Sequence, residues 1–447
     1  MDPITIALIT VIILFTLILL GLHIGFALSV MSLVGVWLIT GKSAVALSLL
    51  SSTAFDAIRD YVFAVLPLFV MMGAFMSNSG AAEDLYRAAN MALRRVPGGV
   101  GVATVIANAV FAAVTGVSVA SAAVFSKIAM PEMIRLNYRK RFAVGSVAGS
   151  SVLGMLIPPS VLMIVYGMLA EVSIGRLFIA GVLPGLVLAG IFSAGIIIMS
   201  IFRPELVGRV RGNQEAVAGA DAAILQPPQF TTLDTLKKVF PVLILIVLVL
   251  GGIWGGFFTP TEASAIGALG AMIVAYAKGM RMLGFKTSLL ETAAGASSIM
   301  FLLIAAQMYS RMLTMSGLMQ WMGELILGLS VAPIVIIFLF IAMLVLLGTI
   351  LDSTSILLIT VPLMAPIVAQ MGYNLIWFGI VMIISVEMGL LTPPFGMVVF
   401  AVKASLGDSV TVEEIFRGSF PFLIMMILAL LIIIAFPILS TWLPSLM

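Results

Sequence analysis

Long apolar segments separated by short polar stretches follow one another along the whole chain. Runs at 4–22, 239–256 and 420–439 contain the roughly 20 apolar residues that a helix needs to cross a bilayer. In a bilayer every backbone polar group must be paired within the chain, so helices are the expected elements. The pattern therefore predicts an all-α polytopic membrane protein.

The composition supports the same class. The chain is 62% hydrophobic and 9% charged, whereas a soluble protein is about one quarter charged. It has no cysteine, which excludes disulfides and thiolate chemistry. The net charge of +3 does not indicate nucleic-acid binding, because the basic residues gather in short loops beside apolar segments. The N-terminus, MDPITIALIT, lacks a basic stretch, so we expect the first apolar run to be a retained span.

The basic residues also predict sidedness. Loops rich in Lys and Arg lie in the cytoplasm, so neighbouring clusters are expected to be separated by an even number of crossings. The clusters lie at 87–95, 135–141, 203–211, 237–238 and 278–286.

Two segments are predicted to enter the membrane without crossing it. The apolar stretch at about 100–130 is too short for two crossings, which need roughly 40 residues, and basic clusters flank it on both sides. A second stretch at about 333–367 has no Lys or Arg between Arg311 and Lys403. We therefore expect two re-entrant hairpins, the first opening to the cytoplasm and the second to the outside.

Two diproline motifs interrupt apolar segments, GMLIPPS at 154–160 and GLLTPPF at 389–395. Proline removes a helical hydrogen bond and clashes with the preceding turn, so each pair predicts a discontinuous helix. A single diproline in a membrane helix is more often a simple kink. Two at matching places favour a functional interruption.

The spacing of these features repeats. Gly116 is followed after 15 residues by Pro131, and Gly348 after 14 residues by Pro362. Each half then reaches its diproline, and the charges give the halves opposite orientations, as in inverted-repeat transporters. The expected organisation is a first repeat with extra N-terminal spans over 1–202, a cytoplasmic linker over 203–236 and a second repeat over 237–447.

The interrupted helices suggest ion sites. A break leaves unpaired carbonyl groups that a hard cation such as sodium can satisfy. One candidate cage joins the carbonyls of the 154–159 break to the hairpin region of Thr115 and Ser118; alternatively, these hydroxyls only bond to backbone. The second candidate cage consists of Gly348, Gly389, Thr392 and the carbonyl of Phe395.

Other polar positions of the hairpins are candidates for binding a substrate, namely Gly116, Ser121, Asp352 and Thr354. An acidic residue inside a membrane segment usually marks a pathway or a partner, but Asp352 could equally cap a helix. Glu387 is interpreted as a structural carboxylate. Glu262, after Thr-Pro-Thr, is expected to cap a helix.

Five motifs resemble the large membrane subunit of tripartite ATP-independent periplasmic (TRAP) transporters, and the resemblance extends from about residue 5 to 440. They are FAVLPLFVMMGAFMSNSG, LGMLIPPSVLMIVYG, GGFFTPTEASAIGA, LDSTSILLITVPLMAPI and LTPPFGMVVFAVK. The resemblance implies sodium-driven uptake of small organic acids by an elevator mechanism in a bacterial or archaeal cytoplasmic membrane, and no enzymatic activity. It implies a periplasmic substrate-binding protein and a separate small four-helix membrane subunit as partners.

The resemblance also implies site residues. One sodium site is expected at Thr115, Ser118, Gly154, Ile157 and Pro159, and a second at Gly348, Gly389, Thr392 and Phe395.

Three alternatives remain at this stage. The first is a stand-alone sodium-coupled anion transporter of related architecture. Only the residues of the five motifs favour the TRAP transporter over it. An intramembrane enzyme with Asp352 and Glu387 as acid and base would need both carboxylates near one substrate position, and leaves the diproline breaks unexplained. A passive channel would pass substrate without a sodium gradient.

Overall fold

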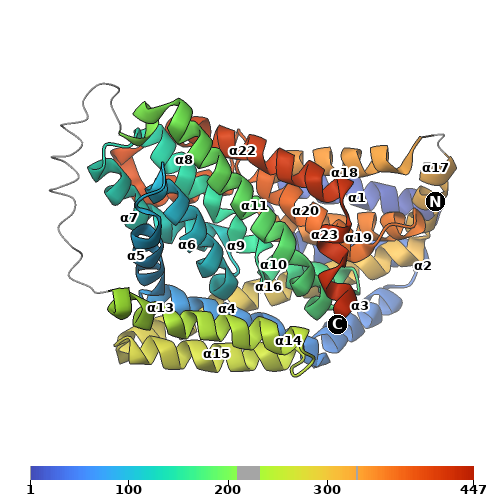
Figure 1. Ribbon diagram of the computed structural model, residues 1–447. Coiled ribbons are helices and arrows are strands. Elements are labelled where there is room, and N and C mark those ends of the chain that lie inside the picture. The colour runs from blue at the N-terminus through green and yellow to red at the C-terminus, as the bar shows by residue number, and fades with distance from the viewer. Residues whose placement is uncertain (1, 209–231, 329–330) are drawn as a thin grey trace.

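A computed structural model describes residues 2–208, 232–328 and 331–447, in which every regular element is a helix (Figure 1). This confirms the predicted all-α class. Part of the predicted linker, residues 209–231, lies outside the described residues. Six described segments are long and apolar enough to cross a membrane, or seven if one bent pair is counted as a single span.

The first half contains long apolar helices, one helical hairpin and one interrupted helix. Its elements are α1 (Pro3–Leu19), α2 (Ile24–Thr40), α3 (Ser43–Arg59), the 3-10 helix η1 (Tyr61–Ala64), α4 (Val65–Asn78), α5 (Ala81–Leu93), α6 (Gly99–Thr115), α7 (Ser118–Arg135), α8 (Lys140–Ser151), α9 (Leu153–Leu156), α10 (Val161–Leu169) and α11 (Ile174–Phe202). Helices α6 and α7 form a hairpin. The segment Lys140–Leu156, which contains α8 and α9, and the helix α10 form the bent pair, with an angle of 41° between them.

The second half has the same order of long helices, hairpin and interrupted helix. Its elements are η2 (Pro204–Val207), α13 (Thr232–Ile246), the π-helix η3 (Val247–Gly251), α14 (Gly252–Trp254), α15 (Pro260–Ala277), α16 (Met282–Ser316), α17 (Leu318–Gly328), α18 (Pro333–Gly348), α19 (Ser353–Gln370), α20 (Leu375–Gly389), α21 (Met397–Leu406), η4 (Gly407–Ser409), α22 (Val412–Ala435), α23 (Ile438–Thr441) and η5 (Leu443–Leu446).

The two hairpins lie toward opposite ends of the molecule. The α6–α7 hairpin lies at the end that carries α5, and α18–α19 at the end that carries the N-terminus and α17 (Figure 1). Between them, α16 packs on α2 and on α4, and α4 packs on α15. These helices form a second group, beside the group built from the hairpins and the interrupted helices.

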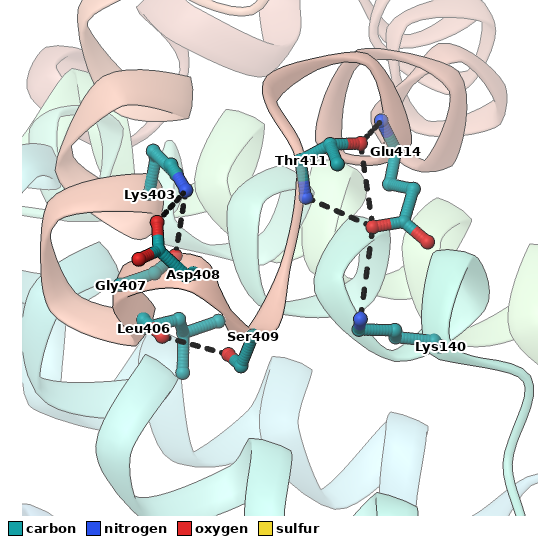
Figure 2. Close-up of polar contacts among 8 residues, drawn as sticks. All are labelled: Lys140, Lys403, Leu406, Gly407, Asp408, Ser409, Thr411 and Glu414. Atoms are coloured by element: carbon teal, nitrogen blue, oxygen red, sulfur yellow. Dashed lines mark hydrogen bonds and ion pairs between the residues drawn. The ribbon is translucent and has the colours of Figure 1, made fainter.

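Helix starts follow the capping rules. Glu262 accepts a hydrogen bond from the Thr259 backbone N–H at 2.8 Å and closes a capping box at α15, which confirms its expected role. Figure 2 shows the same arrangement at α22, where the Thr411 N–H donates to Glu414 at 2.9 Å. Glu414 also lies 3.7 Å from the Lys140 ammonium, so the first turn of α22 is joined to the first turn of α8.

Helices α8 and α22 approach so closely that two glycines face each other's backbone. A Cβ on Gly145 would lie 2.0 Å from the Gly418 carbonyl oxygen, and one on Gly418 would lie 2.1 Å from the Arg141 carbonyl oxygen. Real Cβ atoms do not come this near to an oxygen. Membrane helices associate through such small-residue contacts, because apolar burial alone gains little there.

We therefore predict that Gly418→Ala destabilises the protein, because α8 and α22 would have to separate. Overpacking of this kind costs about 1–3 kcal/mol, which thermal unfolding of the detergent-solubilised protein measures as a lower Tm. Gly190→Ala in α11 is the matched control, since among the described residues no atom lies within 4 Å of its added Cβ. An equal Tm for the two variants would contradict the packing.

Candidate functional site

The tip of the first hairpin is a tight turn between α6 and α7. Gly116 ends α6 with a φ of 66°, the left-handed conformation that glycine adopts without strain, and its N–H donates to the Ala112 carbonyl at 3.0 Å. Val117 is extended, and α7 begins at Ser118. Ser118 is fully buried and Thr115 is 6% exposed.

The first diproline lies directly against this tip. Residues 157–160 separate α9 from α10, and the Val161 N–H, the first of α10, donates to the Gly116 carbonyl at 3.3 Å. A Cβ on Gly116 would lie 2.6 Å from the Pro159 carbonyl oxygen, and one on Gly154 would lie 2.9 Å from the Ser118 nitrogen. The backbones of the hairpin and the interrupted helix are therefore in contact.

The structure thus brings together residues that were predicted for the first sodium site. Thr115 and Ser118 flank the tip, while Gly154 and Pro159 touch it. The Ile157 side chain packs against α11, where a Cβ on Gly185 would lie 2.6 Å from its Cγ1.

The second diproline shows a related contact. A Cβ on Gly389 would lie 2.5 Å from the Gly348 Cα, so the end of α20 touches the end of α18 backbone to backbone. The Thr392 N–H donates to the Gly389 carbonyl at 3.0 Å, and its hydroxyl donates to the Met388 carbonyl at 2.8 Å. Gly348, Gly389 and Thr392 therefore lie together, and Phe395 follows Thr392 by three residues in the break.

The two breaks differ in exposure. Pro158 and Pro159 are buried, whereas Pro393 and Pro394 are exposed and Phe395 is 58% exposed. Both diproline pairs have a cis peptide bond.

The helices after the breaks cross between the halves of the chain. Helix α10 packs against α19 of the second hairpin, and α21 packs against α7 of the first. Each interrupted helix therefore contacts both hairpins, and the four elements form one interlocked group.

The candidate substrate residues are divided between the hairpins. Gly116 is packed on the Pro159 carbonyl, and Ser121 is fully buried with no partner for its hydroxyl among the described residues. Asp352 caps α19, where it accepts a hydrogen bond from the Ser355 N–H at 3.0 Å and another from the Ser355 hydroxyl. Thr354, in the first turn of α19, is half-buried.

The capping interpretation of Asp352 is therefore confirmed. Asp352 also lines a cleft of about 240 Å³ together with His23 of the α1–α2 turn. No contact in the described part of the chain joins the Asp352 and Glu387 carboxylates; Glu387 bonds to Ser118 instead.

That bond is the feature of the candidate site that the sequence did not predict. The Ser118 hydroxyl donates to Glu387 Oε2 at 2.6 Å, across 269 residues of sequence. The sequence feature that could have indicated it is Glu387 itself, an acidic residue about one turn before a break in an apolar helix. Its partner could not be read from spacing.

The chemistry of the group favours oxygen ligands. Within the described ranges, no three His, Cys, Asp or Glu side chains gather where they could hold a metal ion. Besides the Asp352 and Glu387 carboxylates, the polar atoms at the hairpin tips and breaks are carbonyls and hydroxyls, and oxygen atoms of these kinds suit a hard cation.

Comparison with known proteins identifies the family. Residues 11–439 match the family model described as the tripartite ATP-independent periplasmic transporter, DctM component. The chain is 33% identical, over 88% of each chain, to the C4-dicarboxylate TRAP transporter large permease protein DctM of Pseudomonas aeruginosa. It is 28% identical, over 95% of each chain, to the sialic acid TRAP transporter large permease protein SiaM of Vibrio cholerae.

A solved structure supports the fold. The YdaH transporter of Alcanivorax borkumensis aligns over 89% of each chain with a TM-score of 0.63 and 13% sequence identity. The family relatives are transporter permeases, which confirms the prediction that this chain is not an enzyme. With its apolar spans, matched family model and related permeases, the chain is a multi-pass membrane protein that belongs to the large permease (DctM) family of TRAP transporters.

Proposed function

We propose that this permease couples the inward movement of sodium to the uptake of small carboxylates across the bacterial cytoplasmic membrane. It would receive its substrate from a periplasmic binding protein and work with a small four-helix membrane subunit. The relatives named for C4-dicarboxylates and for sialic acid support this substrate class, because both ligands carry carboxylate groups.

The observation that carries the proposal is the backbone contact between each break and a hairpin tip. Unpaired carbonyls at membrane depth cost several kcal/mol each unless a partner satisfies them. At the first break, Gly154 and Pro159 lie against the tip that carries Ser118; at the second, Gly348 lies against Gly389. Sodium bound at these places would give the carbonyl oxygens of the breaks a partner.

The repeat and the elevator motion belong to the same proposal. Residues 1–202 and 237–447 would be inverted repeats, with the two hairpins re-entrant from opposite sides. The crossed packing of α10 on α19 and of α21 on α7 supports a single moving body. Helices α2, α4, α15 and α16 pack together beside it and would form the static scaffold.

Reconstitution tests this function. Proteoliposomes containing the permease, its small subunit and the external binding protein should accumulate a labelled dicarboxylate or sialic acid only with an inward sodium gradient. Equal uptake under a potassium gradient would exclude sodium coupling. Uptake without the binding protein would favour a stand-alone transporter, and passive equilibration would indicate a channel.

We predict that Thr392→Ala weakens the response to sodium, because it removes a hydroxyl oxygen beside Gly389. The sodium concentration for half-maximal uptake should rise about tenfold, equal to about 1.4 kcal/mol of binding free energy. Thr392→Ser keeps the hydroxyl and is the control expected to resemble the wild type. An unchanged sodium response in the Ala variant would remove Thr392 from the site.

The proposed topology makes a separate prediction. The natural chain has no cysteine, so single-cysteine variants report one position each. Met282→Cys, at an 80% exposed residue beside Arg281, should react only with reagents on the cytoplasmic side. Val331→Cys, 44% exposed before the second hairpin, should react with an impermeant thiol reagent on intact cells. The reverse labelling pattern would contradict the proposed orientation.

A further inference from the structure

Glu387 is a buried carboxylate in the last turn of α20. It is 1% exposed, and its neighbours in the helix are apolar or small. None of the ion pairs among the described residues includes it. A carboxylate in such a place is costly and has to be compensated by hydrogen bonds or by positive charge.

Only one of the two carboxylate oxygens of Glu387 has a hydrogen-bond partner among the described residues. Oε2 accepts the Ser118 hydroxyl hydrogen at 2.6 Å, while Oε1 is buried and has no hydrogen-bond partner among the described residues. An unpaired oxygen of a buried charged group costs more than the same atom of a neutral group. A mobile cation nearby would lower this cost.

The position of Glu387 relative to the two breaks is specific. It precedes Gly389, which contacts Gly348, by two residues, and it bonds Ser118, whose backbone contacts Gly154. A single side chain therefore connects the two places where the proposed function puts sodium. No other hydrogen bond between side chains in the described part of the chain joins the first hairpin to α20.

The direction of the hydrogen bond matters. A serine hydroxyl has one hydrogen to donate and two lone pairs that can accept or coordinate. Because the Ser118 hydrogen points to Glu387, the lone pairs of its oxygen remain available on the other side. Without an acceptor there, the hydroxyl could turn and present its hydrogen to a cation instead.

We propose that Glu387 is a positioning residue for the ion sites: it orients the Ser118 oxygen toward the first sodium site and couples that site to the second. This inference rests on the proposed function. When it is ionised beside bound sodium, the Glu387 carboxylate also offsets the repulsion between two cations bound on either side of it. Sodium at one site therefore favours sodium at the other, and the coupling is reciprocal.

Sodium titrations of Glu387→Gln test the inference. The amide keeps the shape of the side chain but removes its charge, so half-maximal uptake should require about tenfold more sodium, within the usual range of coupling between sites, and the Hill coefficient should fall toward one. The KM for substrate at saturating sodium should not change. Glu413→Gln, the same replacement on the surface of α22, is the control expected to resemble the wild type.

A double-mutant cycle with Ser118→Ala separates coupling from independent effects. Once the Ser118 hydroxyl is absent, Glu387→Gln should weaken the sodium response by much less than in the wild type, because the two residues share one interaction. Fully additive effects would contradict the proposed link.

A second readout does not depend on transport. The Tm of the purified protein should rise in sodium relative to potassium, because a ligand that binds the native state stabilises it, and this rise should be smaller in Glu387→Gln. Glu387→Asp is the second variant. It keeps the carboxyl group but shortens the side chain by one methylene, which moves the group away from Ser118. The sodium-dependent rise in Tm should be intermediate between those of the wild type and Glu387→Gln.

The outcomes separate this inference from the function on which it rests. A wild type without any sodium effect on uptake or Tm would overturn both. A sodium effect of the same size in the wild type, Glu387→Gln and Glu387→Asp would overturn this inference alone.

Discussion

The fold depends on how the chain satisfies the backbone where two membrane helices are interrupted. Proline cannot continue a helix, and a bilayer offers no water to the carbonyls that are left over. The chain meets this constraint by placing a hairpin end against each break. Because backbone contact needs the absence of side chains, Gly154 and Gly116 lie at one contact, and Gly348 and Gly389 at the other.

The same constraint explains why these segments pack together. Each break contacts its own hairpin through glycine, and the helix that follows packs on the other hairpin. Neither break could move far without carrying the other. The Ser118–Glu387 hydrogen bond lies between the two contacts, where it joins the first tip to the helix of the second break. The hairpins and interrupted helices therefore form one interlocked body beside the α2, α4, α15 and α16 group.

Much of this could be predicted from local sequence. Apolar run length gave the helices, the diproline pairs gave both interruptions, and the Thr259–Glu262 pair gave a helix start, because each depends on neighbouring residues. The polar tip in the short apolar stretch gave the first hairpin. The matched spacing in the two halves placed Gly116 and Gly348 at corresponding positions of the hairpins, whereas the backbone contacts they make appear only in the folded chain.

The remainder depends on tertiary packing. The sequence allowed Asp352 to be a cap, and only the Ser355 hydrogen bonds of the folded chain show that it is one. The partner of Glu387 is 269 residues away, and no period or spacing specifies such a contact. The different exposure of the two breaks also has no counterpart in their similar sequences.

The most direct measurement of the central claim is to locate a monovalent cation at the breaks. Thallium(I), which replaces sodium and scatters anomalously, can be soaked into crystals of the complex. Anomalous density is expected within coordination distance of the carbonyls at 154–159 and at 389–395, and it should be lost when excess sodium is added. Density at neither break, or density that sodium does not displace, would contradict the claim.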